Sequence, residues 1–101
     1  MKFTIRTNNN LEYDKTPGGS YADMEEFIYD LKETSITKIE RESENALRVD
    51  IKTTAGAERH GWIRTKSKIG KMEMDAIESE KQVFIGRSYD ELINHEFSRE
   101  K

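Results

Sequence analysis

Alternation of apolar and polar residues marks several short strands along the chain. Residues 2–6 (KFTIR) and 47–52 (LRVDIK) alternate with the period of two that a half-buried strand requires. Residues 36–41 are a weaker candidate, because Ile36 and Ile39 are three positions apart and do not alternate. The pattern predicts strands in all three segments, with the clearest at 47–52.

Two further segments carry apolar residues at the spacing of an α-helix. The apolar positions are Met24, Phe27, Ile28 and Leu31 in residues 21–33, and Tyr89, Leu92, Ile93 and Phe97 in residues 89–99. Ser20 and Ser88 precede these stripes, each with an acid three residues later, which predicts that they cap the two helices. Each serine follows a glycine-containing turn (GGSY and GRSY), but the acids of each first turn would repel a phosphate. We interpret both turns as helix starts.

The remaining segments complete the prediction of an α+β fold. Residues 8–20 read as a polar loop and residues 82–85 (QVFI) as a short last strand. Residues 72–76 alternate, which predicts another strand, while a helix over 72–81 is the rival because Met, Glu, Ala and Lys are good helix formers. Short connections between successive strands predict an antiparallel sheet of about five strands, with two amphipathic helices packed on one face.

Composition narrows the classes of function. The chain has no cysteine, which excludes disulfides, thiolate catalysis and cysteine-based zinc sites. No apolar run is long enough for a signal peptide or a membrane span, so we expect a single cytoplasmic domain over residues 1–101 that does not contact membranes. No motif indicates a cofactor or a metal ion. The frequent Lys, Glu, Ile and Asn suit an AT-rich genome, such as that of a bacterium or a phage.

A basic stripe at residues 59–71 (RHGWIRTKSKIGK) is the strongest candidate for a binding surface. The stripe has no acid, and it lies in a segment, 36–71, with nine basic and five acidic side chains, although the whole chain has a net charge of -3. If residues 58–66 form a strand, its side chains alternate between two faces. One face then carries His60, Trp62, Arg64 and Lys66, and the other carries Gly61, Ile63 and Thr65. The candidate binding residues are Arg59, His60, Trp62, Arg64, Lys66, Lys68 and Lys71.

Two arrangements of this stripe are consistent with the sequence. With Ile63 in the core, Trp62 stands exposed among cations, as in proteins that stack single-stranded nucleic acid or that anchor on a partner protein. Alternatively, Trp62 fills the core and Ile63 lies at its edge, because tryptophan is highly buried on average. The lysines would then be ordinary turn residues, or charges that protect a sheet edge.

The two histidines and the many carboxylates give weaker indications of chemistry. His95 follows Glu91 by four residues, which predicts a surface pair because two ligands are too few for a metal site. His60 could act as a general base only with a positioned partner, and the sequence places none beside it. The alternating Glu40, Glu42 and Glu44 read as a solvated strand face.

These observations lead to three hypotheses about function. The leading one is a small non-catalytic interaction protein, a regulator or an inhibitor that acts by binding a protein partner. The second is nucleic-acid binding through residues 59–71, and the third is a small enzyme with a site centred on His60. A homodimer is a further expectation, because the core is thin and the sheet edges are exposed.

Overall fold

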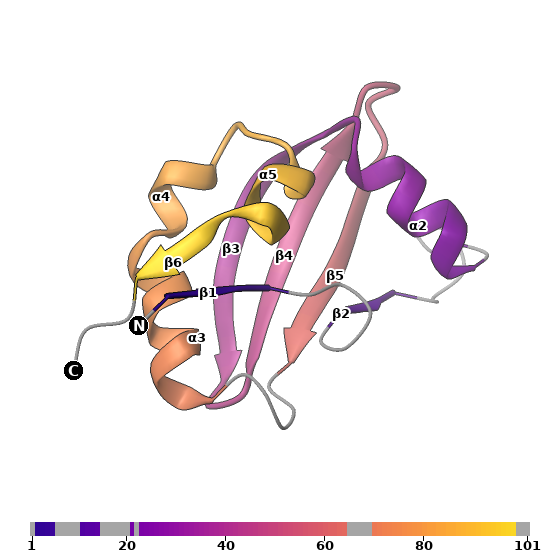
Figure 1. Ribbon diagram of the computed structural model, residues 1–101. Coiled ribbons are helices and arrows are strands. Elements are labelled where there is room, and N and C mark those ends of the chain that lie inside the picture. The colour runs from indigo at the N-terminus through magenta and orange to yellow at the C-terminus, as the bar shows by residue number, and fades with distance from the viewer. Residues whose placement is uncertain (1, 6–10, 15–20, 22, 65–69, 99–101) are drawn as a thin grey trace.

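The computed structural model describes residues 2–5, 11–14, 21, 23–64 and 70–98, and these residues form six β-strands and four α-helices. In chain order the elements of Figure 1 are β1 (Lys2–Thr4), β2 (Leu11–Tyr13), α2 (Met24–Leu31), β3 (Thr34–Ser43), β4 (Ala46–Thr53), β5 (Glu58–Arg64), α3 (Lys71–Ser79), α4 (Lys81–Phe84), α5 (Tyr89–Asn94) and β6 (Glu96–Ser98). The predicted α+β class with antiparallel pairing is confirmed.

The strands divide into two sheets. The larger sheet has the order β2-β5-β4-β3, and β1 pairs with β6 in a separate two-stranded sheet. The prediction of a loop over residues 8–20 is wrong for β2, in which Leu11 and Tyr13 lie opposite Ile63 and Gly61 of β5. This strand has only three residues, and its partner strand lies about fifty positions later in the chain, so the local pattern was short.

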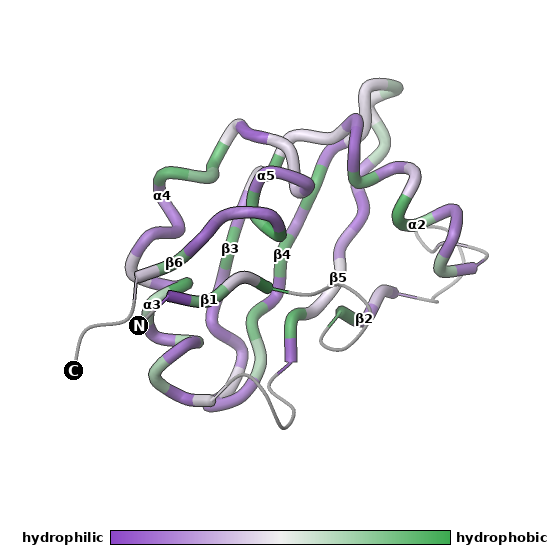
Figure 2. Tube along the Cα trace, viewed as in Figure 1, coloured by the Kyte–Doolittle hydropathy of each residue, from purple (hydrophilic) through white to green (hydrophobic). Residues whose placement is uncertain are grey.

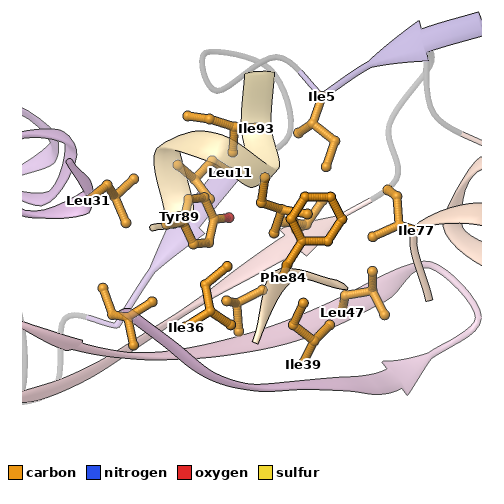
Figure 3. Packing of buried hydrophobic residues seen from close by; sticks show 14 of the residues in the cluster. Ile5, Leu11, Leu31, Ile36, Ile39, Leu47, Ile77, Phe84, Tyr89 and Ile93 are labelled. Atoms are coloured by element: carbon orange, nitrogen blue, oxygen red, sulfur yellow. The ribbon is translucent and has the colours of Figure 1, made fainter. Parts of the chain in front are cut away.

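One face of the larger sheet carries the hydrophobic core. In Figure 1 the helices α3 and α5 and the β1–β6 sheet lie over β3 and β4. Figure 2 shows apolar and polar positions alternating along β4, and Figure 3 shows the inward side chains meeting those of the C-terminal helices. The labelled core side chains include Ile36, Ile39 and Leu47 from the sheet and Ile77, Phe84, Tyr89 and Ile93 from the helical segment, all of them buried.

Helix α2 packs on the same face at the β2–β5 end of the sheet. Gly61 points inward there, and a Cβ atom on it would lie 2.7 Å from the carbonyl oxygen of Glu12 and 3.1 Å from Cζ of Phe27. The absent side chain therefore makes room for the Phe27 ring, which stacks on Tyr13 with ring centroids 5.2 Å apart. With α2 on this side, the described helices and the β1–β6 sheet all lie on the inward side of the larger sheet.

A β-bulge explains the irregular spacing in β3. Ile36 pairs with Ile51 and Ile39 pairs with Val49, while Lys38 lies opposite Asp50, so β3 has one extra residue between the two isoleucines. An extra residue shifts the alternation by one position. Ile36 and Ile39 therefore both face the core, although they are three positions apart.

Of the two predictions for residues 72–81, the helix is confirmed and the strand at 72–76 is wrong, and the prediction of a strand at 82–85 is wrong as well. Residues 72–76 belong to helix α3, in which Met74 and Ile77 are fully buried one helical turn apart and Met72 is 50% exposed. Residues 82–84 belong to the short helix α4, which buries Phe84 and leaves Val83 52% exposed. At 72–76 the alternation was misleading, because the residues are good helix formers, whereas at 82–84 helical packing overrides the strand propensity of Val83 and Phe84.

The two predicted helices are shorter than expected. Helix α2 begins at Met24, and the side chain of Asp23 caps it by accepting a bond from the Glu26 N–H at 2.8 Å, so the predicted cap at Ser20, which lies outside the described residues, is wrong. The Ser88 cap is confirmed, with its hydroxyl accepting from the Glu91 N–H at 3.3 Å.

Helix α5 ends at Asn94, where the prediction continued it to residue 99. The backbone of the following residue is extended, and residues 96–98 form β6 on β1. Phe97 pairs with Phe3 across the two strands, and their rings stack 5.2 Å apart. Phe97 therefore reaches the core from a strand, which the helical spacing did not show.

None of the helices among the described residues has the length and apolar composition needed to cross a bilayer. The cytoplasmic location stays a prediction.

Candidate interaction surface

The face of the larger sheet that points away from the core is polar, except for one tryptophan. No described helix or strand lies over this face, and its side chains are exposed or half-buried, apart from the buried Asp14. We call it the Trp62 face and define it by the outward residues Glu12, Asp14, Lys38, Glu40, Arg48, Asp50, Lys52, Glu58, His60, Trp62 and Arg64.

Trp62 occupies the middle of this surface. The strand register sets it in a row across all four strands, with Glu12 on one side and Arg48 and then Glu40 on the other. The neighbouring row runs from Asp14 through His60 and Asp50 to Lys38. The indole is thus surrounded by charged and polar side chains from every strand of the sheet.

The position of Ile63 decides between the two arrangements that the sequence left open. Ile63 is fully buried on the core face, whereas Trp62 is half-buried on the outward face. Trp62 is therefore not a core residue. Its Nε1–H is nevertheless shielded from solvent and has no hydrogen-bond partner within the described part of the chain, so packing alone holds the ring.

Two side chains of β5 flank the indole. The guanidinium of Arg64 lies 5.9 Å from its centroid, a cation–π distance. The His60 ring meets it edge-on, with centroids 5.3 Å apart. His60 is itself fixed by a close polar contact between its Nε2 and the carboxylate of Asp14, whose side chain is only 10% exposed. Asp14 therefore positions Trp62 indirectly, through the histidine ring.

Carboxylates neutralise the arginines of this face. Nε of Arg64 lies 2.5 Å from a Glu12 oxygen, and Nε of Arg48 lies 3.0 Å from Oδ1 of Asp50. The pKa of Arg48 is raised above its usual value, mainly by the hydrogen bond to Asp50. More distant Glu42 and Glu40 raise the pKa of Arg48 in the same direction.

A pocket of about 340 Å³ opens along β3, β4 and β5 next to His60. Its lining residues are Thr37, Arg48, Asp50, Ile51, Glu58, Arg59 and His60. The lining includes two carboxylates, an imidazole and two guanidinium groups. Such a site can bind a small polar group.

The stripe predicted at residues 59–71 is only partly one surface. His60, Trp62 and Arg64 lie together on the Trp62 face as expected. Arg59 points the other way, with its guanidinium 5.7 Å from the Tyr21 ring centroid and Nη1 donating to the Glu58 carbonyl. Lys71 begins α3, on the core side of the sheet. The two other members, Lys66 and Lys68, lie outside the described residues.

Comparison with protein-family models, with curated protein sequences and with solved structures gives no significant match to this chain.

Eight of the eleven residues of the Trp62 face were absent from the sequence-based site, among them four that contact or adjoin its predicted members. Arg48 and Asp50 were recognised as the polar positions of a strand, but nothing local placed them beside β5. Glu12 and Asp14 were read as part of a loop, although they alternate with Leu11 and Tyr13 in a four-residue pattern that could have indicated a strand. These acids turn a stripe that is basic in sequence into a surface of balanced charge.

The predicted pairing of His95 with Glu91 is wrong. Nε2 of His95 lies 3.4 Å from Glu80, and Glu91 pairs with Arg87 at 3.7 Å. The helix ends before His95, so the two residues do not share a helical face. Within the described residues no cluster of three or more potential ligands could hold a metal ion.

Proposed function

We propose that the protein is a non-catalytic binding protein, a regulator or an inhibitor, that holds a protein partner on its Trp62 face. The observation that carries this proposal is the half-buried indole in the middle of an uncovered sheet, with Arg64 and His60 against it and Arg48 in the next strand. Tryptophan and arginine are the residues most enriched among those that dominate the binding energy of protein interfaces.

The balance of charge favours a protein over a nucleic acid. A polyanion gains affinity by pairing its phosphates with free cations and releasing counterions. On this face Arg64 is paired with Glu12 and Arg48 with Asp50, so a phosphate backbone would compete with carboxylates already in place. A protein surface, which carries both charges, can exchange such pairs without a large cost.

The first experiment tests whether Trp62 is needed for a protein complex. Partners cross-linked to the wild-type protein would be identified, purified and titrated against it by calorimetry. We expect Trp62→Ala to weaken binding by roughly 30-fold or more, which corresponds to about 2 kcal/mol for a central interface residue. Tyr29→Ala is the control, because Tyr29 is an aromatic residue that is 70% exposed on α2, away from this face. A partner that binds Trp62→Ala as tightly as wild type contradicts the proposal.

Single-stranded nucleic acid is the second candidate, supported by the Trp62 ring beside Arg64 on an open sheet face. Aromatic side chains on such faces stack bases. Trp62 is the sole tryptophan of the chain, so its emission reports directly on this surface. Quenching by an oligonucleotide, with an affinity that falls steeply as salt rises, would replace the protein-partner proposal. Unchanged emission at low salt removes the second candidate.

A further inference from the structure

One short segment of the chain holds both of the side chains that flank the indole of Trp62. Along β5, His60 and Arg64 lie on the two sides of Trp62 and contact its ring. Glu12 in β2 lies 2.5 Å from Nε of Arg64, and Asp14, two residues later, contacts Nε2 of His60. Each flank of the indole is therefore tied to an acid of the same edge of the sheet.

The position of the indole depends on these two flanks. The Nε1–H of Trp62 has no hydrogen-bond partner in the described part of the chain, so no bond of its own fixes the ring. The next strand does not replace the acids at Arg64, because the residue opposite Arg64 in β4 is the buried Ala46. Loss of the contact with β2 would thus leave this flank without a partner among the described residues.

The attachment of β2 to the sheet is short. β2 pairs with β5 over three residues, whereas β4 pairs with β5 over seven. One further backbone bond runs from the N–H of Asp14 to the carbonyl of His60 at 3.2 Å. On the core side Leu11 is buried and Tyr13 stacks on a phenylalanine of α2, which favours the paired state. A short edge strand opens locally at a lower free energy than the central strands of its sheet.

We infer that residues 11–14, the β2 segment, form a latch that keeps the binding surface ordered. When the segment pairs with β5, its two acids hold His60 and Arg64 against the indole, and when it detaches, the indole loses both flanks. The inference rests on the proposed function and adds its regulation, because a partner that anchors on a fixed indole binds the latched form more tightly. By linkage, binding of that partner keeps the β2 segment paired.

The latch can be tested on the protein alone. Glu12→Ala/Asp14→Ala removes both contacts, and ¹⁵N relaxation of the single indole N–H reports the mobility of Trp62. We expect the order parameter of this N–H to fall from about 0.85, as in a rigid backbone, to below about 0.6 in the variant. Glu40→Ala/Glu42→Ala is the matched control, because both acids are exposed on β3 and neither contacts a flank of the indole. An unchanged order parameter in the first variant, or an equal fall in the control, overturns the inference.

Hydrogen exchange of the wild-type protein tests the latch without a substitution, and it decides the question if the double variant does not fold. We expect the amide of Asp14 to exchange at least about tenfold faster than the slowest amides of β4, because local opening exposes it while the sheet stays folded. Equal exchange rates would show that the β2 segment opens only with the whole protein, which overturns the inference.

The inference and the proposed function fail in different ways. A purified partner that loses affinity for Trp62→Ala, together with an indole that stays ordered in Glu12→Ala/Asp14→Ala, would leave the function standing and overturn the latch. A mobile indole in that variant, together with a partner indifferent to Trp62→Ala, would support the latch and overturn the function.

Discussion

Replacing Tyr89 with phenylalanine should stabilise this protein. Tyr89 is 1% exposed in the core, and its hydroxyl has no hydrogen-bond partner within the described part of the chain. A hydroxyl buried without a partner costs about 1–3 kcal/mol, because its bonds to water are lost and not replaced. The phenyl ring keeps the same packing, and the loss of one oxygen leaves only a small gap.

We expect Tyr89→Phe to raise the free energy of unfolding at pH 7 by about 1–2 kcal/mol. For a domain of this length each kcal/mol raises the melting temperature by roughly 4–8 °C. Urea unfolding followed by circular dichroism measures the first quantity and a thermal scan the second. Tyr29→Phe is the control: Tyr29 is 70% exposed, so the change should stay within about 0.5 kcal/mol.

Alkaline pH gives the same substitution a second readout. Burial raises the pKa of Tyr89 well above the ordinary value of about 10. Above pH ~10 the unfolded chain loses this proton while the native protein keeps it, so the native state binds more protons and stability falls as pH rises. The stabilisation that comes from keeping Tyr89 protonated in the native protein is fully present below pH ~10. Above that pH the free energy of unfolding falls by about 1.4 kcal/mol per pH unit.

In Tyr89→Phe this loss is absent, so the stability of the variant should fall less steeply above pH ~10 than that of wild type. Burial raises the pKa of Tyr21 as well, so some alkaline sensitivity should remain in the variant. A variant that is less stable than wild type at pH 7 would show that the hydroxyl has a partner. An unchanged alkaline slope would show that Tyr89 ionises as easily in the native protein as in the unfolded chain.

Three further substitutions test the packing of individual elements, each by urea unfolding. Gly61→Ala should cost about 1–3 kcal/mol, because the added methyl group meets the β2 backbone and the Phe27 ring; a neutral result would show that β2 can move aside. Met74→Ala should lower the free energy of unfolding by about 2–5 kcal/mol, and Met72→Ala by less than about 0.5 kcal/mol, because only Met74 is buried in the helix. Equal losses for the two variants would favour a strand, in which both side chains face the same way. Ser88→Ala should cost about 1 kcal/mol through loss of the α5 cap, and an unchanged stability would contradict that bond.

Local periodicity was sufficient for the elements that depend on one buried stripe. Strand β4 and the buried faces of α2 and α5 follow directly from it. It failed where a distant segment decides the conformation: β6 exists because Phe97 pairs with Phe3 at the other end of the chain. The bulge in β3 was not predicted either, because only the register with β4 shows the extra residue.

The candidate site divides in the same way. Alternation along β5 was enough to put His60, Trp62 and Arg64 on one face. The charge of that face was not predictable from the stripe, because the acids that neutralise it come from β2 and β4. Those contacts depend on the strand order of the sheet, which no single segment encodes.

The pairing of β1 with β6 has a practical consequence for attaching the protein to a surface or a reporter. Lys2 lies opposite Ser98 in this pairing, so the two ends of the described chain leave the molecule side by side. They leave from the side that the helices cover, and the Trp62 face points the other way. A tether at either end would therefore hold the molecule with its candidate binding surface turned toward the solution, and a fluorophore at each end would report the opening of this strand pair through energy transfer.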